Sequence, residues 1–137
     1  GDLRAGGLPM AVSKLVSELS AHDVKIDFET LGFNGSRLDE KIELFSYRIV
    51  QELLNNAVKH AQASSIMVQI SKFETEVNLV VEDNGQGFNY HEVTIRDGLG
   101  LKSIQSRVEQ LNGTIDFDTS PGKGTSVSIN IPLNSAV

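Results

Sequence analysis

The stretch "VQELLNNAVKHAQ", residues 50–62, decides how the rest of the sequence is interpreted. Its apolar residues recur at three- and four-residue steps, which predicts a helix; they are Val50, Leu53, Leu54, Ala57, Val58 and Ala61. The pattern is interrupted by Glu52, Asn55, Asn56, Lys59 and His60. Asparagine is a poor helix-interior residue because its amide competes for backbone hydrogen bonds. A carboxylate and two amides in so apolar a helix therefore need an explanation other than folding.

The sequence around this stretch predicts one helix over residues 39–63 and two layers of structure around it. Apolar residues at helical spacing predict two further helices, and alternating apolar residues predict strands. The helices are expected at 9–21 and 101–111, and the strands at 24–32, 64–73, 76–83, 113–120 and 124–133. Residues 84–100 form a long, glycine-bearing loop, and long loops in compact domains are usually functional. The order predicts an α+β fold, a mixed sheet covered on one face by about three helices.

Composition excludes several classes of protein. The 137 residues fit one domain, and 39% apolar with 22% charged residues is an ordinary globular balance. A net charge of -6 argues against non-specific nucleic-acid binding. No apolar run approaches the roughly eighteen residues of a membrane span, so no membrane contact is expected. The lack of cysteine fits a reducing compartment, such as the cytoplasm.

Two glycine clusters resemble phosphate-binding motifs but do not match them. "SPGKGTS", residues 120–126, lacks the spacing of a P-loop, and strands rather than a strand and a helix flank it. It is interpreted as a hairpin turn, where glycine supplies positive φ at little cost. "GQGFNY", residues 85–90, lacks the third glycine of a dinucleotide fingerprint. Neither cluster alone indicates a site.

Two other segments are more informative. In "RDGLGLKS", residues 96–103, Gly98 and Gly100 precede a helix, where free amides and the helix dipole favour an anion. A flexible lead-in to an ordinary helix explains the same residues. In "VEDNGQGF", residues 81–88, Asp83 ends a strand and offers an acceptor beside flexible backbone. Asp-Asn-Gly is also a strong turn sequence, but the segment continues into a long loop instead of a second strand.

Four segments together resemble a known family. "QELLNNAVKHA", "VEDNGQGF", "DGLGLKSIQSRVEQLNG" and "GKGTSVSINIPL" are similar to the asparagine box, two glycine boxes and final strands of sensor histidine kinase ATP-binding domains. That family has the Bergerat fold, a two-layer α/β sandwich shared with DNA gyrase, mismatch-repair proteins and heat-shock chaperones. The "RIVQE" and "KHA" segments resemble the subgroup that pairs with helix-turn-helix response regulators. The resemblance covers residues 8–133 in collinear order.

The resemblance implies roles for the polar residues of the central helix. Asn56 would give its side-chain oxygen to Mg²⁺, whose other ligands would be phosphate oxygens and waters. Glu52, one turn earlier, would occupy the place of the general base. Lys59 and His60 would approach the phosphates or the ribose and adenine. The polar face of the helix would therefore border an ATP site.

The resemblance also implies roles for the loops. Asp83 would accept a hydrogen bond from the adenine amine, Gly85 and Gly87 would shape the purine pocket, and Thr125 would support Asp83 from a neighbouring strand. Residues 88–97 would form a short ATP lid. The phosphates would be wrapped at the helix start by Gly98, Leu99, Gly100 and Leu101.

Three of these helix residues also have a purely structural explanation. Glu52 could form an ion pair with Arg48, four residues earlier. Asn56 could be a buried amide bonded to neighbouring backbone. His60 could pack at the helix end, where a positive charge is favourable. Asn55 is left outside the expected site because it could equally lie on the helix surface.

The expected domain is incomplete as a kinase. Residues 8–133 would be the catalytic domain, 1–7 a linker from an upstream segment, and 134–137 a tail. The family's phosphate acceptor is a histidine on a separate dimerisation hairpin, and His22, His60 and His91 do not lie in such a hairpin. The expected partners are this hairpin and, through a full-length homodimer, a response regulator, with the isolated chain monomeric. A Bergerat-type serine kinase, similar to anti-sigma factors, or a nucleotide-binding switch is the alternative.

Overall fold

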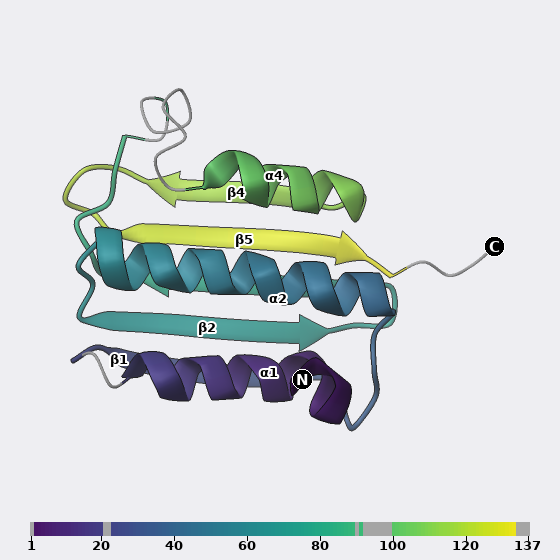
Figure 1. Ribbon diagram of the computed structural model, residues 1–137. Helices are drawn as coiled ribbons and strands as arrows, with labels where there is room; N and C mark the ends of the chain where they lie inside the picture. The colour runs from purple at the N-terminus through teal and green to yellow at the C-terminus, as the bar shows by residue number, and fades with distance from the viewer. Residues whose placement is uncertain (1, 21–22, 90, 92–99, 134–137) are drawn as a thin grey trace.

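Five strands form one mixed sheet (Figure 1). The computed structural model describes residues 2–20, 23–89, 91 and 100–133. The strand order is β1-β2-β3-β5-β4, with β1 parallel to β2 and the other neighbouring pairs antiparallel. The strands are β1 (Lys25–Leu31), β2 (Ser65–Lys72), β3 (Glu76–Asp83), β4 (Thr114–Thr119) and β5 (Thr125–Pro132).

Three long helices, α1 (Asp2–Leu19), α2 (Glu40–Asn55) and α4 (Leu101–Gln110), lie on one face of this sheet (Figure 1). The predicted α+β layering is therefore confirmed within the described residues. The start of α1 was predicted wrongly, because the helix begins at Asp2 instead of near Pro9. A break at Gly7, with φ of 72°, joins two helical segments. The first segment has too few apolar residues to produce a periodic pattern.

The end of the central helix also differs from the prediction. The sequence pattern predicts one helix to residue 63, but α2 ends at Asn55 and continues as a π-helical turn, η2 (Asn56–His60). Its wider hydrogen bond runs from the Ala61 N–H to the Asn56 carbonyl, 2.9 Å. Single π turns within α-helices occur often at functional sites. Asn56, Lys59 and His60, which interrupt the apolar pattern, all lie in this turn.

The core lies between the helices and the inner face of the sheet. Alternation places one side chain in two on that face, as expected for a sheet covered on one side. Fully buried members from the strands and from all three helices are Val12, Ile49, Leu54, Val68, Ile70, Val77, Ile104, Ile129 and Ile131. This packing fixes where α2 ends relative to the strands.

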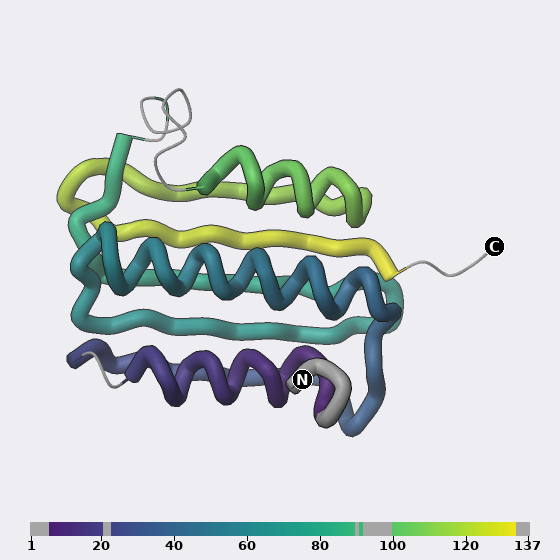
Figure 2. Tube along the Cα trace, viewed as in Figure 1, coloured from purple at the N-terminus to yellow at the C-terminus, as the bar shows by residue number. Residues whose placement is uncertain are grey.

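Several element ends meet at one edge of the molecule. Figure 2 shows the end of α2 and the start of α4 at the same end of the sheet as the end of β3 and the start of β5. The strand register there aligns Asp83 with Thr125, and Thr125 with Thr119. One step further into the sheet, Val81, Val127 and Phe117 are aligned in the same way.

Candidate functional site

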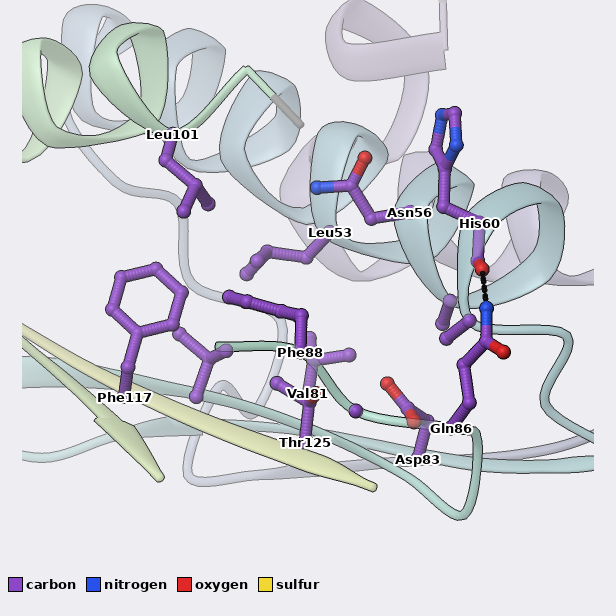
Figure 3. Close-up of a pocket in the computed structure, with 14 residues that line it drawn as sticks. Leu53, Asn56, His60, Val81, Asp83, Gln86, Phe88, Leu101, Phe117 and Thr125 are labelled. Carbon is purple, nitrogen blue, oxygen red and sulfur yellow. Dashed lines mark hydrogen bonds between the residues drawn. The ribbon is translucent and has the colours of Figure 1, made fainter. Parts of the chain in front are cut away.

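A cavity of about 300 Å³ lies at this edge, between the inner face of the sheet and the end of the central helix (Figure 3). That volume is at the lower end of the range of small-molecule sites. It is lined by Leu53, Asn56, Ala57, His60, Ala61, Val81, Asp83, Gln86, Gly87, Phe88, Leu101, Phe117, Thr125 and Val127. The walls are mostly apolar, and few polar side chains face the cavity.

The floor of the cavity follows from the strand register. Val81, Val127 and Phe117 form an apolar row on three adjacent strands. The next row, at the strand ends, brings Asp83 beside Thr125. A flat apolar surface with a polar edge suits a planar ring that carries hydrogen-bonding groups on its rim.

Asp83 is the acidic residue of this floor. Its carboxylate accepts a hydrogen bond from the Gly85 N–H at 2.8 Å and another from the Thr125 backbone N–H. Burial raises the pKa of Asp83 above its ordinary value of 3.8, and the two backbone donors oppose that increase. The backbone therefore fixes the carboxylate in an apolar cavity, where it can accept a hydrogen bond from a ligand.

The loop after β3 is attached on both sides. The Asn84 side-chain oxygen accepts from the Ser64 and Ser65 N–H groups, each at 3.0 Å. The Gln86 amide donates to the His60 carbonyl at 2.7 Å, marked in Figure 3. The loop is thereby held to the end of η2 and to the start of β2.

The turn between β4 and β5 holds the other side of that loop. The Gly122 N–H donates to the Gln86 carbonyl at 2.5 Å. Gly124, with φ of 74°, packs so closely on the Asp83 carbonyl that a Cβ would clash. The predicted hairpin turn in "SPGKG" is confirmed, and it also supports the cavity.

The central helix contributes two of its predicted site residues to the cavity, Asn56 and His60. In Figure 3 the His60 ring points away from Asp83, while its backbone carbonyl faces Gln86. Lys59 is exposed and outside the lining. Arg48 donates a hydrogen bond to the Gln51 side chain at 3.3 Å, so its partner is Gln51 and not Glu52, the partner suggested by the sequence.

Glu52 reaches the start of α4. Gly100 adopts a left-handed conformation, φ 68°, as the N-cap of that helix. A Cβ on Gly100 would collide with the Glu52 carboxylate oxygen, so the glycine makes room for the carboxylate. Leu101, the next residue, lines the cavity. The structure thus brings Glu52, Gly100 and Leu101 together at the side of the cavity where α4 begins.

Other predicted residues fall into three groups. Gly87 and Thr125 line the cavity, and Gly85 holds Asp83 instead of lining it. Gly98 and Leu99 lie outside the described residues, and so does most of the predicted lid, residues 90 and 92–97.

Sequence reasoning missed the apolar lining. The apolar residues that were missed are Leu53, Ala57, Ala61, Val81, Phe88, Phe117 and Val127. One polar lining residue, Gln86, was missed as well. The signal for Val81, Phe117 and Val127 was present, because each is an inward residue of an alternating strand. The sequence did not show which inward residues border a cavity instead of the core.

Across residues 2–20, 23–89, 91 and 100–133 there is no group of three histidine, cysteine or acidic residues able to hold a metal ion. The same part of the chain contains no helix with the length and apolar character needed to span a bilayer.

Comparisons with known proteins indicate the family of this chain. Residues 41–135 match the family described as histidine kinase-, DNA gyrase B- and HSP90-like ATPase. The signal transduction histidine-protein kinase/phosphatase DegS of Brevibacillus brevis is 35% identical over 94% of this chain and 33% of its own length. Sensor histidine kinase ComP of Bacillus subtilis is 38% identical over 93% of this chain and 17% of its length. The chain thus spans a third or less of these relatives.

A solved structure shows the same fold. The blue-light activated histidine kinase of Erythrobacter litoralis EL346 superposes with a TM-score of 0.73 at 22% identity, covering 94% of this chain and 42% of that one. At that identity the likeness establishes the fold alone. The family match covers most of the chain and includes the helix, loop and strands that form the cavity. The chain therefore belongs to the histidine kinase-, DNA gyrase B- and HSP90-like ATPase family, and within it resembles sensor histidine kinases.

Proposed function

We propose that this chain is the catalytic ATP-binding domain of a two-component sensor histidine kinase. It would bind ATP with Mg²⁺ in the cytoplasm and donate the γ-phosphoryl group to a histidine on a dimerisation hairpin outside this chain. The observation that carries the proposal is Asp83, a carboxylate held by two backbone donors at the rim of an apolar cavity. The family match and the kinases among the relatives support it.

Asp83 explains the choice of base. The apolar row of Val81, Val127 and Phe117 would contact the face of adenine, and the carboxylate would accept from its exocyclic amine. Guanine carries a carbonyl at that position, which would set one acceptor against another. The floor therefore favours adenine over guanine.

The residues at the end of the helix fit the expected metal. Asn56 lines the cavity and has an amide oxygen, the hard ligand that Mg²⁺ accepts. When bound, Mg²⁺ would neutralise negative charge on the phosphates.

The side of the cavity where α4 begins fits the phosphates. Gly100 and Leu101 begin a helix whose positive end would face them, and Gly98, Leu99 and Lys59 are proposed to complete this group. The Glu52 carboxylate lies close to Gly100, and in this proposal it accepts a proton from the attacking histidine. In the full-length homodimer the phosphohistidine would then supply a response regulator.

The test is phosphoryl transfer between separate molecules. The purified chain is incubated with ATP labelled at the γ-phosphate, first alone and then with the dimerisation hairpin from its own gene. Transfer depends mainly on positioning, so the chain alone should bind ATP but remain unlabelled. With the hairpin, an acid-labile label on the hairpin alone is expected.

The Asp83→Ala variant is the control, because it should bind ATP weakly and label the hairpin poorly. Acid-stable label on a serine of an added protein would contradict the proposal and favour a serine kinase. The absence of ATP binding by the parent chain would contradict both.

A further inference from the structure

The Thr119 side chain lies beside the cavity floor, at the end of β4. Thr119 ends β4 and is aligned with Thr125, which is aligned in turn with Asp83. Thr125 lines the cavity, whereas Thr119 is not part of the lining. Thr119 can therefore act on a ligand only through its neighbours.

Three hydrogen bonds meet at the Thr119 hydroxyl. The Phe88 N–H donates to Oγ1 at 3.2 Å. Oγ1 lies 3.2 Å from the Gly124 carbonyl and 2.8 Å from the Thr125 hydroxyl. Phe88 and Thr125 both line the cavity, so the hydroxyl joins two separate parts of its wall.

The proton count assigns a direction to each bond. A hydroxyl has one proton to donate and two lone pairs to accept with. A carbonyl can only accept, so the Thr119 proton goes to Gly124. Either hydroxyl could donate in the contact between Thr119 and Thr125, but all three contacts are hydrogen bonds at once only when Thr119 accepts from Thr125 as well as from Phe88. The Thr125 proton is thus directed away from the ligand, and its oxygen can only accept on the cavity side.

We propose that Thr119 is a positioning residue that fixes the Thr125 hydroxyl as an acceptor and thereby helps to select a base carrying an amine. The inference rests on the proposed function, since it presumes that a purine lies over the floor. Asp83 and Thr125 then present two adjacent acceptors. A base with an amine beside these two acceptors can donate hydrogen bonds to them, whereas a base with a carbonyl at that position cannot.

The test measures base preference in matched variants. Affinities for ATP and inosine triphosphate are measured by titration calorimetry with Mg²⁺; inosine has a carbonyl where adenosine has the amine. Thr119→Val keeps the shape but removes the hydroxyl, which leaves Thr125 free to donate. The preference for ATP over inosine triphosphate should fall about tenfold, the effect of one hydrogen bond. Thr119→Ser keeps the hydroxyl and should retain the parental preference within about threefold.

Thermal unfolding without ligand checks that each variant folds, and Thr119→Ala replaces the valine variant if that one does not. A parental preference in the hydroxyl-free variant, or an equal loss in Thr119→Ser, would overturn this inference and leave the proposed function intact. If the parent fails to bind ATP, the proposed function is itself overturned.

Discussion

At the scale of single residues, Asp83 must satisfy opposing requirements. Ligand recognition needs the ionised acceptor, whereas burial in the apolar cavity disfavours the charge and raises its pKa. The Gly85 and Thr125 N–H groups compensate for part of that cost. The buried charge is therefore unfavourable for folding, and we expect it to serve ligand binding.

Asp83→Ala should weaken ATP binding by about 2 kcal/mol, roughly thirtyfold, as expected for a charge-assisted hydrogen bond. Calorimetric titration with an ATP analogue and Mg²⁺ measures the change. The matched control is Glu82→Ala, because Glu82 is exposed on the opposite face of the same strand. This variant should bind ATP with the affinity of the parent. Unchanged affinity in Asp83→Ala, or equal affinity of the parent for GTP, would refute the assignment.

Asn56 and Glu52 should separate metal binding from chemistry. Asn56→Ala removes the proposed amide ligand and should weaken ATP binding in Mg²⁺ much more than in its absence. Glu52→Gln keeps the shape and should leave ATP affinity nearly unchanged, but slow transfer to the hairpin, since the amide cannot accept a proton as a base does. Single-turnover labelling measures the rate. A parental rate in Glu52→Gln would remove its catalytic role.

At the scale of elements, an ion pair between the buried Glu43 and the half-exposed Arg37 joins the starts of α1 and α2. Glu43, 4% exposed, accepts from Arg37 Nε at 2.9 Å and Nη2 at 2.8 Å. Its carboxylate also accepts from the Leu38 N–H at 3.2 Å and from the Leu8 N–H, just after the break at Gly7. One side chain therefore connects both helices and the segment before α2.

Glu43→Gln should lower the free energy of unfolding by about 2 kcal/mol, because it weakens several hydrogen bonds to a buried charge. Chemical denaturation measures the change. Glu40→Gln, an exposed acid in the same first turn, is the control and should change stability much less. Equal losses of unfolding free energy in the two variants would mean that the ion pair of Glu43 stabilises the fold no more than an exposed acid at the helix start.

The same pair predicts a pH dependence. The hydrogen bonds from Arg37 lower the pKa of Glu43 below its ordinary 4.5, so the folded state binds this proton less tightly than the unfolded state. Its contribution is therefore complete above about pH 5 and is lost as the pH falls through the lowered pKa. The stability difference between the parent and Glu43→Gln should shrink on acidification below 4.5. A constant difference down to about pH 2 would contradict this explanation.

The elements also show what a sequence can predict. Hydrophobic periodicity located all five strands and the core of each helix, since burial on one face determines it. It did not predict the π turn at Asn56–His60, because one extra residue per turn barely alters a short apolar pattern. It also missed Phe88 and Phe117, whose exposure to a cavity depends on how distant elements pack. The roles expected for Asn56, Asp83 and Thr125 came from the resemblance to a known family and not from periodicity, and all three residues line the cavity.

At the scale of the whole molecule, ATP should stabilise the fold by mass action. At a hundredfold excess over its dissociation constant a ligand adds about 2.7 kcal/mol, which for a domain of this size raises Tm by roughly 5 to 10 °C. Thermal unfolding with and without ATP and Mg²⁺ measures the shift. At the same ATP concentration Asp83→Ala should gain only about 1 kcal/mol. An equal increase in Tm for the parent and for Asp83→Ala would mean that ATP binds at a site that does not include Asp83.

The pairing of β3 with β5 has a consequence for how the chain folds. The hairpins β2–β3 and β4–β5 join strands that are neighbours in the sequence, whereas Asp83 and Thr125 are about 40 positions apart. Closing so long a loop costs entropy and comes late in folding. The floor that would recognise the base does not exist until the two halves of the sheet have joined. A nucleotide therefore binds only the completed topology, and we expect it to slow unfolding without accelerating folding.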